Sequence, residues 1–182
     1  DPLEIVHRLG PGLFRFLLSS VNLNALLLIA KIMTIFAEKG RMELAFNKIL
    51  KKDLQLVIPF ILELGEYKTE KAVLEDRLAE MFDQNYECFG VYSEGKMIGV
   101  FGLWFMTRHY AGKSIEPDHI FIDPTFQNRG VGKEIFNFIF SYALEKGCET
   151  AELNSYVHNF RSHKFYMNHG FVIKGYHFLK KL

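Results

Sequence analysis

Two glycines and two basic residues stand in front of an apolar helical pattern in the segment FQNRGVGKEIF, residues 126–136. A helix N-terminus exposes unpaired backbone N–H groups and the positive end of the helix dipole. Gly130 and Gly132 remove the Cβ atoms that would keep a phosphate away from those groups, and Arg129 and Lys133 add positive charge. The segment is neither a P-loop nor the three-glycine dinucleotide fingerprint. The segment predicts a phosphate cradle, that is, a turn whose backbone binds a phosphate. The alternative is an ordinary glycine turn that only connects a strand to a helix.

A second candidate pair lies in the segment NFRSHKFYMNHGF, residues 159–171. Asn159 and Tyr166 are seven residues apart, which is two turns of a helix, so they share one helical face. Taken alone, the pair fits a helix cap followed by a buried aromatic residue.

The two segments together resemble the GNAT superfamily of acyl-CoA-dependent N-acetyltransferases. Gln127-x-x-Gly130-x-Gly132 is similar to the family's Q/R-x-x-G-x-G/A signature, and residues 159–171 resemble its next segment, in which a Tyr follows an Asn by seven residues and precedes a Gly-Phe pair. The resemblance covers roughly residues 42–182. It implies an enzyme that moves an acetyl group from acetyl-CoA to a primary amine of a small molecule or protein. A non-catalytic acyl-CoA-binding or sensing module on the same fold is the alternative.

The resemblance also implies where acetyl-CoA lies. Its diphosphate would rest on the glycine turn, which consists of Gln127, Asn128, Arg129, Gly130, Val131, Gly132 and Lys133. Its pantetheine arm would pair with the main chain of the preceding strand at Ile120, Phe121 and Ile122. That pairing requires an open edge, which family members provide by splaying this strand from the next. Asn159 would bind the pantetheine amides.

Acyl transfer requires a neutral amine, a stabilised oxyanion and a protonated leaving thiolate. Tyr166 stands at the family's position for the acid, and a tyrosine hydroxyl has an ordinary pKa of about 10. Glu116 and Asp118 alternate onto one face of the cofactor strand, where the family often places a base. A solvated strand end is the alternative for either carboxylate. Main-chain N–H groups of the splayed strand can contact the oxyanion.

The elements that must position these residues alternate between strand and helix patterns. Alternating polarity and turn residues predict strands at 42–49, 119–123, 149–156 and 170–182, and a hairpin at 86–105. Helical periodicity and caps predict helices at 51–65 (bent at Pro59), 69–83, 130–146 and 159–169. This order predicts an α/β fold with a mixed sheet and helices on both faces. The resemblance adds that the sheet is mostly antiparallel and that splayed strands form the acyl-CoA cleft.

Residues 1–41 form a separate segment, and residues 42–182 form the predicted acetyltransferase domain. The segment is rich in Leu, Phe and Ile, but polar residues interrupt every long apolar run, so no membrane span is predicted. We expect helices that pack on the domain or across a homodimer and take no part in catalysis.

Composition excludes several other classes of protein. The 182 residues carry a net charge of +1, so the overall electrostatic field does not favour binding to nucleic acid or to an anionic membrane. Cys88 and Cys148 form no CxxC pair, which favours free thiols in a reducing cytoplasm. His158, His163 and His169 do not share one helical face, so no metal site is predicted.

Overall fold

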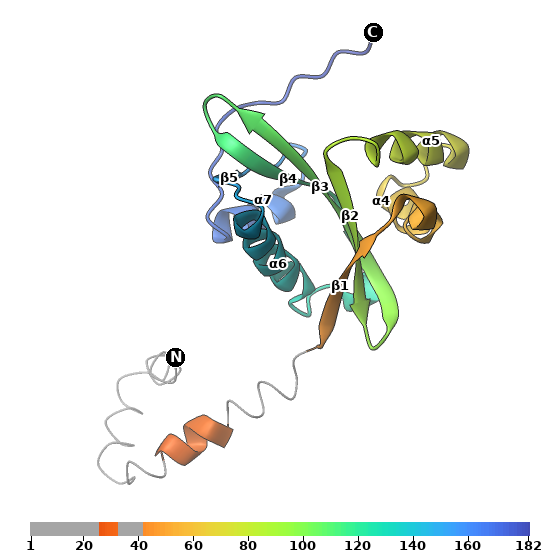
Figure 1. Cartoon of the computed structure of the whole chain (residues 1–182). Helices are drawn as coiled ribbons and strands as arrows, with labels where there is room; N and C mark the ends of the chain where they lie inside the picture. Colours follow the sequence, from red (N-terminus) through yellow and green to blue (C-terminus); the bar gives the residue numbers. More distant parts are fainter. Residues whose placement is uncertain (1–25, 33–41) are drawn as a thin grey trace. The chain divides into compact units, whose positions relative to one another are not determined.

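The computed structural model describes residues 26–32 and 42–182, and Figure 1 shows both parts. Residues 26–32 form a helix, and the rest of the extension predicted over residues 1–41 lies outside the described residues. Glu43–Leu182 form one compact unit. Within the described ranges, no helix is long and apolar enough to cross a membrane.

A five-stranded sheet runs through this unit in the order β1-β2-β3-β4-β5. The strands are β1 (Leu44–Ile49), β2 (Tyr86–Ser93), β3 (Lys96–Arg108), β4 (Gly112–Ile122) and β5 (Thr150–Ala151). Three of the four pairings are antiparallel, and only β4 with β5 is parallel. The predicted mixed, mostly antiparallel sheet is confirmed.

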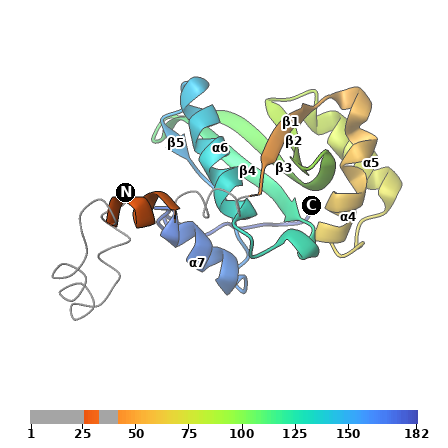
Figure 2. The ribbon, with the colours of Figure 1, turned by 90° about the horizontal axis from the view of Figure 1, so that it is seen from below.

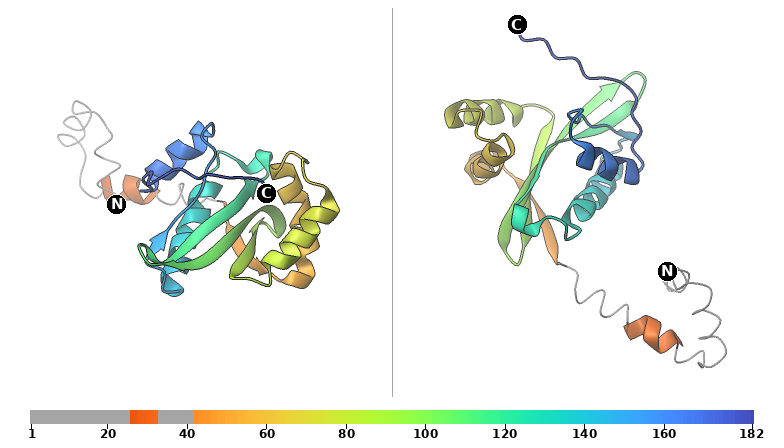
Figure 3. Two further views of the ribbon diagram at one scale, coloured as in Figure 1. Left: turned by 90° about the horizontal axis from the view of Figure 1, so that it is seen from above. Right: turned by 180° about the vertical axis from the view of Figure 1, so that it is seen from behind.

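Helices cover both faces of the sheet, as Figures 1 and 2 show. One face carries the 3-10 helix η1 (Lys51–Leu56) with α4 (Ile58–Leu64) and α5 (Lys71–Met81). The other face carries α6 (Val131–Glu145) and α7 (Phe160–Asn168). Figure 3 shows the same two layers from above and from behind. The prediction of helices on both faces is therefore also confirmed.

Alternation along β2 gives the sheet its two apolar faces. Tyr86 and Cys88 are buried in the cluster that includes Leu78 of α5. The next residue along the strand, Phe89, faces the opposite way and contacts Phe138 of α6, with 5.3 Å between ring centroids. Because successive strand residues point to opposite faces, one strand supports both helical layers.

The helix predicted over residues 51–65 is wrong as a single bent element. The chain forms η1, passes through Val57 and starts a new helix, α4, at Ile58. Pro59 lies in the first turn of α4, where its missing N–H group has no partner to lose. The proline therefore starts a helix instead of bending one.

Two strand predictions near the C-terminus are also corrected. The strand expected at 149–156 is limited to Thr150–Ala151, and no strand forms in residues 170–182. Ordered strands need a neighbouring ladder, and a two-residue edge strand offers little of one. Apolar side chains of the last segment consequently remain exposed, including Ile173 at 73% and Phe178 at 90%.

β4 and β5 separate soon after they meet, and this opens one edge of the sheet. They pair at two positions, the second of which joins Ile115 to Ala151. The N–H of Glu152 then donates to the Ile115 carbonyl at 2.9 Å. Beyond that bond, no described strand pairs with residues 116–122 on this side. The predicted splayed strands are thus present, and the open edge is the stretch that leads to the glycine turn.

Candidate functional site

The glycine turn is tied to the end of β4. Asp123 accepts a hydrogen bond from the Thr125 backbone N–H at 2.9 Å, which caps the short 3-10 helix η2 (Pro124–Phe126). The side-chain amide of Gln127 then donates to the Ile122 carbonyl at 2.9 Å. These bonds fix where the chain leaves the strand and enters α6.

Gly130 is the N-cap of α6 and has the shape that a phosphate cradle needs. Its φ of +83° lies in the left-handed region, and no described atom comes within 4 Å of the position of an added Cβ. Among the described residues, no side chain caps this helix. The first backbone N–H groups of α6, from Val131 to Lys133, have no acceptor within the helix and lie at the positive end of its dipole.

Basic side chains surround this turn. The Arg129 guanidinium lies over the Phe126 ring at 5.6 Å, and the Lys96 ammonium lies over the same ring at 5.7 Å. Arg161 of α7 donates to the Asn128 side-chain oxygen. Sequence reasoning missed Lys96 and Arg161 because they reach the turn from distant parts of the chain. The turn offers both backbone donors and positive charge to an anion.

α7 carries the second pair of predicted residues. Asn159 caps the helix, because its side-chain oxygen accepts the Ser162 backbone N–H at 3.3 Å. Two turns later, half-buried Tyr166 packs against Phe136 of α6, with 5.8 Å between centroids. Burial raises the pKa of Tyr166, partly opposed by a hydrogen bond with Ser162. The hydroxyl is therefore protonated at neutral pH and able to donate.

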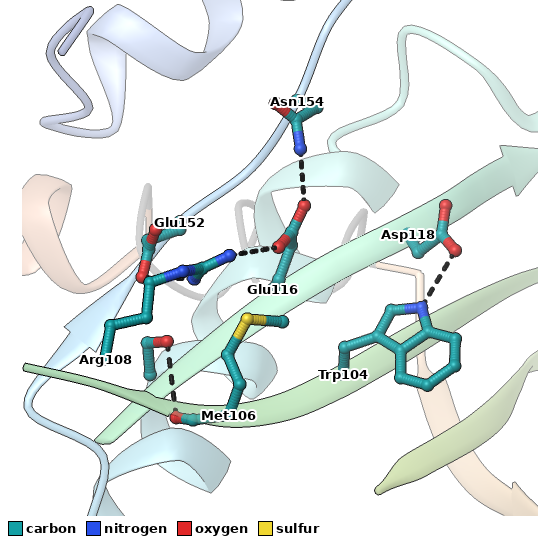
Figure 4. Close-up of polar contacts among 8 residues, drawn as sticks. Trp104, Met106, Arg108, Glu116, Asp118, Glu152 and Asn154 are labelled. Atoms are coloured by element: carbon teal, nitrogen blue, oxygen red, sulfur yellow. Dashed lines mark hydrogen bonds and ion pairs between the residues drawn. The ribbon is translucent and has the colours of Figure 1, made fainter. Parts of the chain in front are cut away.

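Glu116 projects from the point where β4 and β5 separate, and Figure 4 shows its contacts. The Asn154 side-chain amide donates to its carboxylate at 2.6 Å, bridging the gap between the two strands. Arg108 of β3 lies 3.7 Å from its other oxygen and forms a closer ion pair, at 2.8 Å, with Glu152. The Glu116 side chain is only 16% exposed, so it is held in place.

Asp118 lies two residues further along the same face but has different partners. It accepts hydrogen bonds from the Trp104 indole at 3.1 Å and from the His119 backbone N–H at 2.7 Å. Burial alone would raise the pKa of Asp118, but contacts with His119 and Trp104 outweigh it and lower the pKa to about 2. A carboxylate so readily ionised is a poor proton acceptor at neutral pH.

A cavity of about 380 Å³ lies between these groups. It is lined by Trp104, Met106, Glu116, Pro117, Asp118 and Asn154. The volume is within the range of small-molecule sites. Because Asn154 comes from the splayed segment and Glu116 from β4, the cavity sits at the mouth of the strand separation.

A β-bulge separates this cavity from the predicted pantetheine edge. The register of β3 with β4 shifts between Val100 and Gly102, opposite His119 and Ile120. His119 has a φ of +36°, which is strained for a residue other than glycine. Its ring is held by the Tyr86 hydroxyl, 2.8 Å from its Nε2. The bulge re-aims the following residues, Ile120 to Ile122, along the open edge.

Gly102 is the position that lets the His119 ring lie in this place. A Cβ added at Gly102 would collide with that ring and lie 2.6 Å from Cε2 of Tyr86. We therefore expect Gly102→Ala to lower the free energy of unfolding by about 1–3 kcal/mol, the usual effect of overpacking. Urea denaturation measures the loss. Gly175→Ala is the matched control, since nothing lies within 4 Å of its added Cβ, and an equal loss in both variants would contradict this packing account.

The structure thus brings the predicted residues into two groups. The turn residues and Ile120 to Ile122 form a continuous path, and Glu116 and Asp118 line the cavity at its far end. Tyr166 lies on α7 and Asn159 is its N-cap, and within the described chain no hydrogen bond or ion pair joins either residue to Glu116 or Asp118. Asn154 was not predicted as a site residue, because only the fold brings it next to this strand. No group of three metal-ligating side chains occurs among the described residues.

The model of the acetyltransferase (GNAT) family matches residues 54–171 of this chain. A search of curated proteins found no match. Among solved structures, a possible acetyltransferase from Clostridium difficile 630 is similar, with a TM-score of 0.66 and 12% identity over 76% of this chain and 97% of that one.

Two further solved structures share the fold. An aminoglycoside N-acetyltransferase in complex with CoA has a TM-score of 0.66 and 17% identity, over 78% of this chain and 95% of that one. Glucosamine-6-phosphate N-acetyltransferase from Arabidopsis thaliana has a TM-score of 0.57 and 18% identity, over 76% and 98%. At these identities the likeness concerns the fold, while the family match rests on the sequence.

Proposed function

The chain belongs to the acetyltransferase (GNAT) family and is an acyltransferase, and on this premise we propose that it transfers an acetyl group from acetyl-CoA to a primary amine. The observation that supports this most is the continuous path along β4. It starts at the glycine turn, follows the open edge past Ile122 and Ile120, and ends at the cavity beside Glu116. A solved aminoglycoside N-acetyltransferase of the same fold is in complex with CoA.

The residues along this path fit the parts of acetyl-CoA. The diphosphate suits the N–H groups of Val131 to Lys133, next to Arg129 and Arg161. The pantetheine amides suit the open backbone of Ile120 to Ile122, with Asn159 as a side-chain partner. The cosubstrate supplies an acetyl group that is activated as a thioester, and the protein supplies orientation and proton transfer.

Glu116 is the proposed base and Tyr166 the proposed acid. The acceptor ammonium loses one proton to Glu116, and the neutral nitrogen attacks the acetyl carbon. The carbon–sulfur bond then breaks, the sulfur keeps the electron pair, and the Tyr166 hydroxyl protonates the departing thiolate. The nitrogen gives up its second proton as the amide forms, which restores the Tyr166 hydroxyl through solvent, and Glu116 releases its proton to solvent. Asp118 is a weaker candidate for the base because its pKa is lowered to about 2.

A thiol-release assay tests the proposed function. Purified protein, acetyl-CoA and a panel of primary amines should release free CoA thiol only when an amine is present. Mass spectrometry should show the amine heavier by one acetyl group. Binding of acetyl-CoA with no amine-dependent release across the panel would contradict the proposal.

Gly130→Glu should weaken acetyl-CoA binding by at least tenfold, because the new side chain adds bulk and negative charge where the diphosphate would lie. Isothermal titration measures the affinity. Gly147→Glu is the matched control: Gly147 follows the other end of α6, has a φ of +72° and also has open space around an added Cβ. Equal acetyl-CoA affinity in the parent and in a folded Gly130→Glu variant would contradict binding of the diphosphate at the glycine turn.

We also infer a cytoplasmic location from the thiols. Cys88 and Cys148 are both buried and unbonded in the structure, and burial raises the pKa of Cys88 to about 11. Thiols in this state suit a reducing compartment. Fractionation of the native host, followed by detection of the protein, tests the location.

A further inference from the structure

Two carboxylates line the cavity, and they differ in whether they take up a proton during the proposed reaction. A reacting ammonium must lose its proton, so it leaves no lasting positive charge beside the base, Glu116. Asp118 keeps its negative charge throughout, because its contacts with Trp104 and His119 favour the ionised form. Its ion-pair partner in the described chain is His119, with 3.5 Å between His119 Nδ1 and the carboxylate, Tyr86 also interacts with its charge, and its own side chain is 47% exposed. A carboxylate that stays negative beside the cavity suits a ligand group that stays positive throughout the reaction.

The distance between the two carboxylates predicts the distance between the two positively charged groups of the ligand. Glu116 and Asp118 alternate onto one face of β4, so they are separated by roughly 7 Å along the strand. Trp104 lies opposite Glu116 on β3 and bonds to Asp118, so its ring forms the wall between them. Trp104 is partly exposed, and an indole face attracts organic cations. Met106 extends the apolar wall.

We propose that the acceptor is a small primary amine carrying a second positive charge, which Asp118 and Trp104 bind while the reacting nitrogen faces Glu116. This inference rests on the proposed acetyl transfer and names the class of its acceptor. An extended alkyl diamine whose two nitrogens are roughly 7 Å apart spans the two carboxylates. The cavity volume of about 380 Å³ is large enough for a molecule of that size.

The same charges disfavour an acceptor that carries an acid group. Glu116 and Asp118 are the charged side chains that line the cavity, and their ion-pair partners in the described chain, Arg108 and His119, are not among the lining residues. Arg108 is already paired with both Glu116 and Glu152, so it has little left to offer a ligand carboxylate. An acceptor carboxylate near Asp118 would meet a like charge in partly desolvated surroundings.

Three compounds of one chain length test this inference: 1,5-diaminopentane, pentylamine and 5-aminopentanoate. Their far ends are positive, neutral and negative. Thiol release at neutral pH gives kcat/KM for each. We expect the diamine to exceed pentylamine by about tenfold or more, since an ion pair and a cation–π contact act together. The acid should be the poorest acceptor.

Variants of Asp118 and Trp104 test whether these residues cause the preference for the diamine. Asp118→Asn should bring the diamine-to-pentylamine ratio close to one, mainly through KM for the diamine. Trp104→Leu should reduce the ratio, whereas Trp104→Phe keeps an aromatic face and retains most of it. Asp83→Asn, at an exposed ion pair with Lys51 outside the cavity, is the control and should change nothing.

The outcomes separate this inference from the proposed function. A parent ratio near one, with pentylamine acetylated, overturns the dicationic acceptor and leaves acetyl transfer standing. A large ratio that survives Asp118→Asn also overturns it. If none of the three compounds nor any other amine releases thiol, the proposed function fails and this inference fails with it.

Discussion

Replacing Glu116 by Gln should lower turnover by roughly 10²–10⁴-fold at neutral pH, the usual scale for losing a general base. The substitution keeps the length of the side chain and removes its ability to take a proton from the ammonium. Acetyl-CoA affinity should change little, because the turn and the strand edge remain intact. Steady-state thiol release and a separate binding titration measure the two quantities.

The pH dependence distinguishes a base from a structural carboxylate. Raising the pH supplies more neutral amine, so the deficit of Glu116→Gln should shrink toward the pKa of the acceptor. Glu152→Gln is the matched control, because Glu152 shares the Arg108 ion pair but does not line the cavity. If turnover of Glu116→Gln stayed within a few-fold of the parent at neutral pH, Glu116 would not be the base. It would then be a structural residue that contacts Asn154 and Arg108.

Tyr166→Phe should lower turnover by roughly 10²-fold or more, since it keeps the ring and deletes only the proposed proton donor. The ring contacts with Phe136 and Phe171 remain, so stability should change little. Acetyl-CoA affinity should also stay close to that of the parent. Pre-steady-state and steady-state thiol release on one good amine measure the effect.

Tyr142→Phe is the control for removing a tyrosine hydroxyl. Tyr142 donates to Glu87 at 2.6 Å and lies on α6, so its loss should affect stability without a comparable loss of turnover. If Tyr166→Phe kept turnover within a few-fold of the parent, the residue would be a packing residue. Protonation of the thiolate would then belong to water or another side chain.

The parts of the fold that local signals define were predictable from the sequence. The hairpin β2–β3 follows from alternating residues around Gly95, and α6 follows from its amphipathic pattern between Gly130 and Gly147. The Asn159 cap of α7 was also predicted. Each of these features depends on residues a few positions apart, so the sequence displays its cause directly.

Features that depend on distant partners were not predictable in the same way. The apolar pattern of residues 170–182 suits a strand, but the short β5 gives it no ladder to join. Trp104 and Asn154 belong to the site only because β3 and the segment after β5 meet Glu116. The lowered pKa of Asp118 comes mainly from its chain neighbour His119 and only in part from the Trp104 bond across strands.

Hydrogen–deuterium exchange with and without CoA tests the central claim most directly, namely that the open edge of β4 and the glycine turn hold the cosubstrate. Backbone N–H groups that pair with the ligand exchange more slowly. We predict that CoA slows exchange in peptides covering residues 118–122 and 130–134, and that Gly130→Glu abolishes the effect at the same CoA concentration. Saturating CoA, shown to be bound by titration, that leaves both peptides unchanged or protects only other parts of the chain would contradict the account.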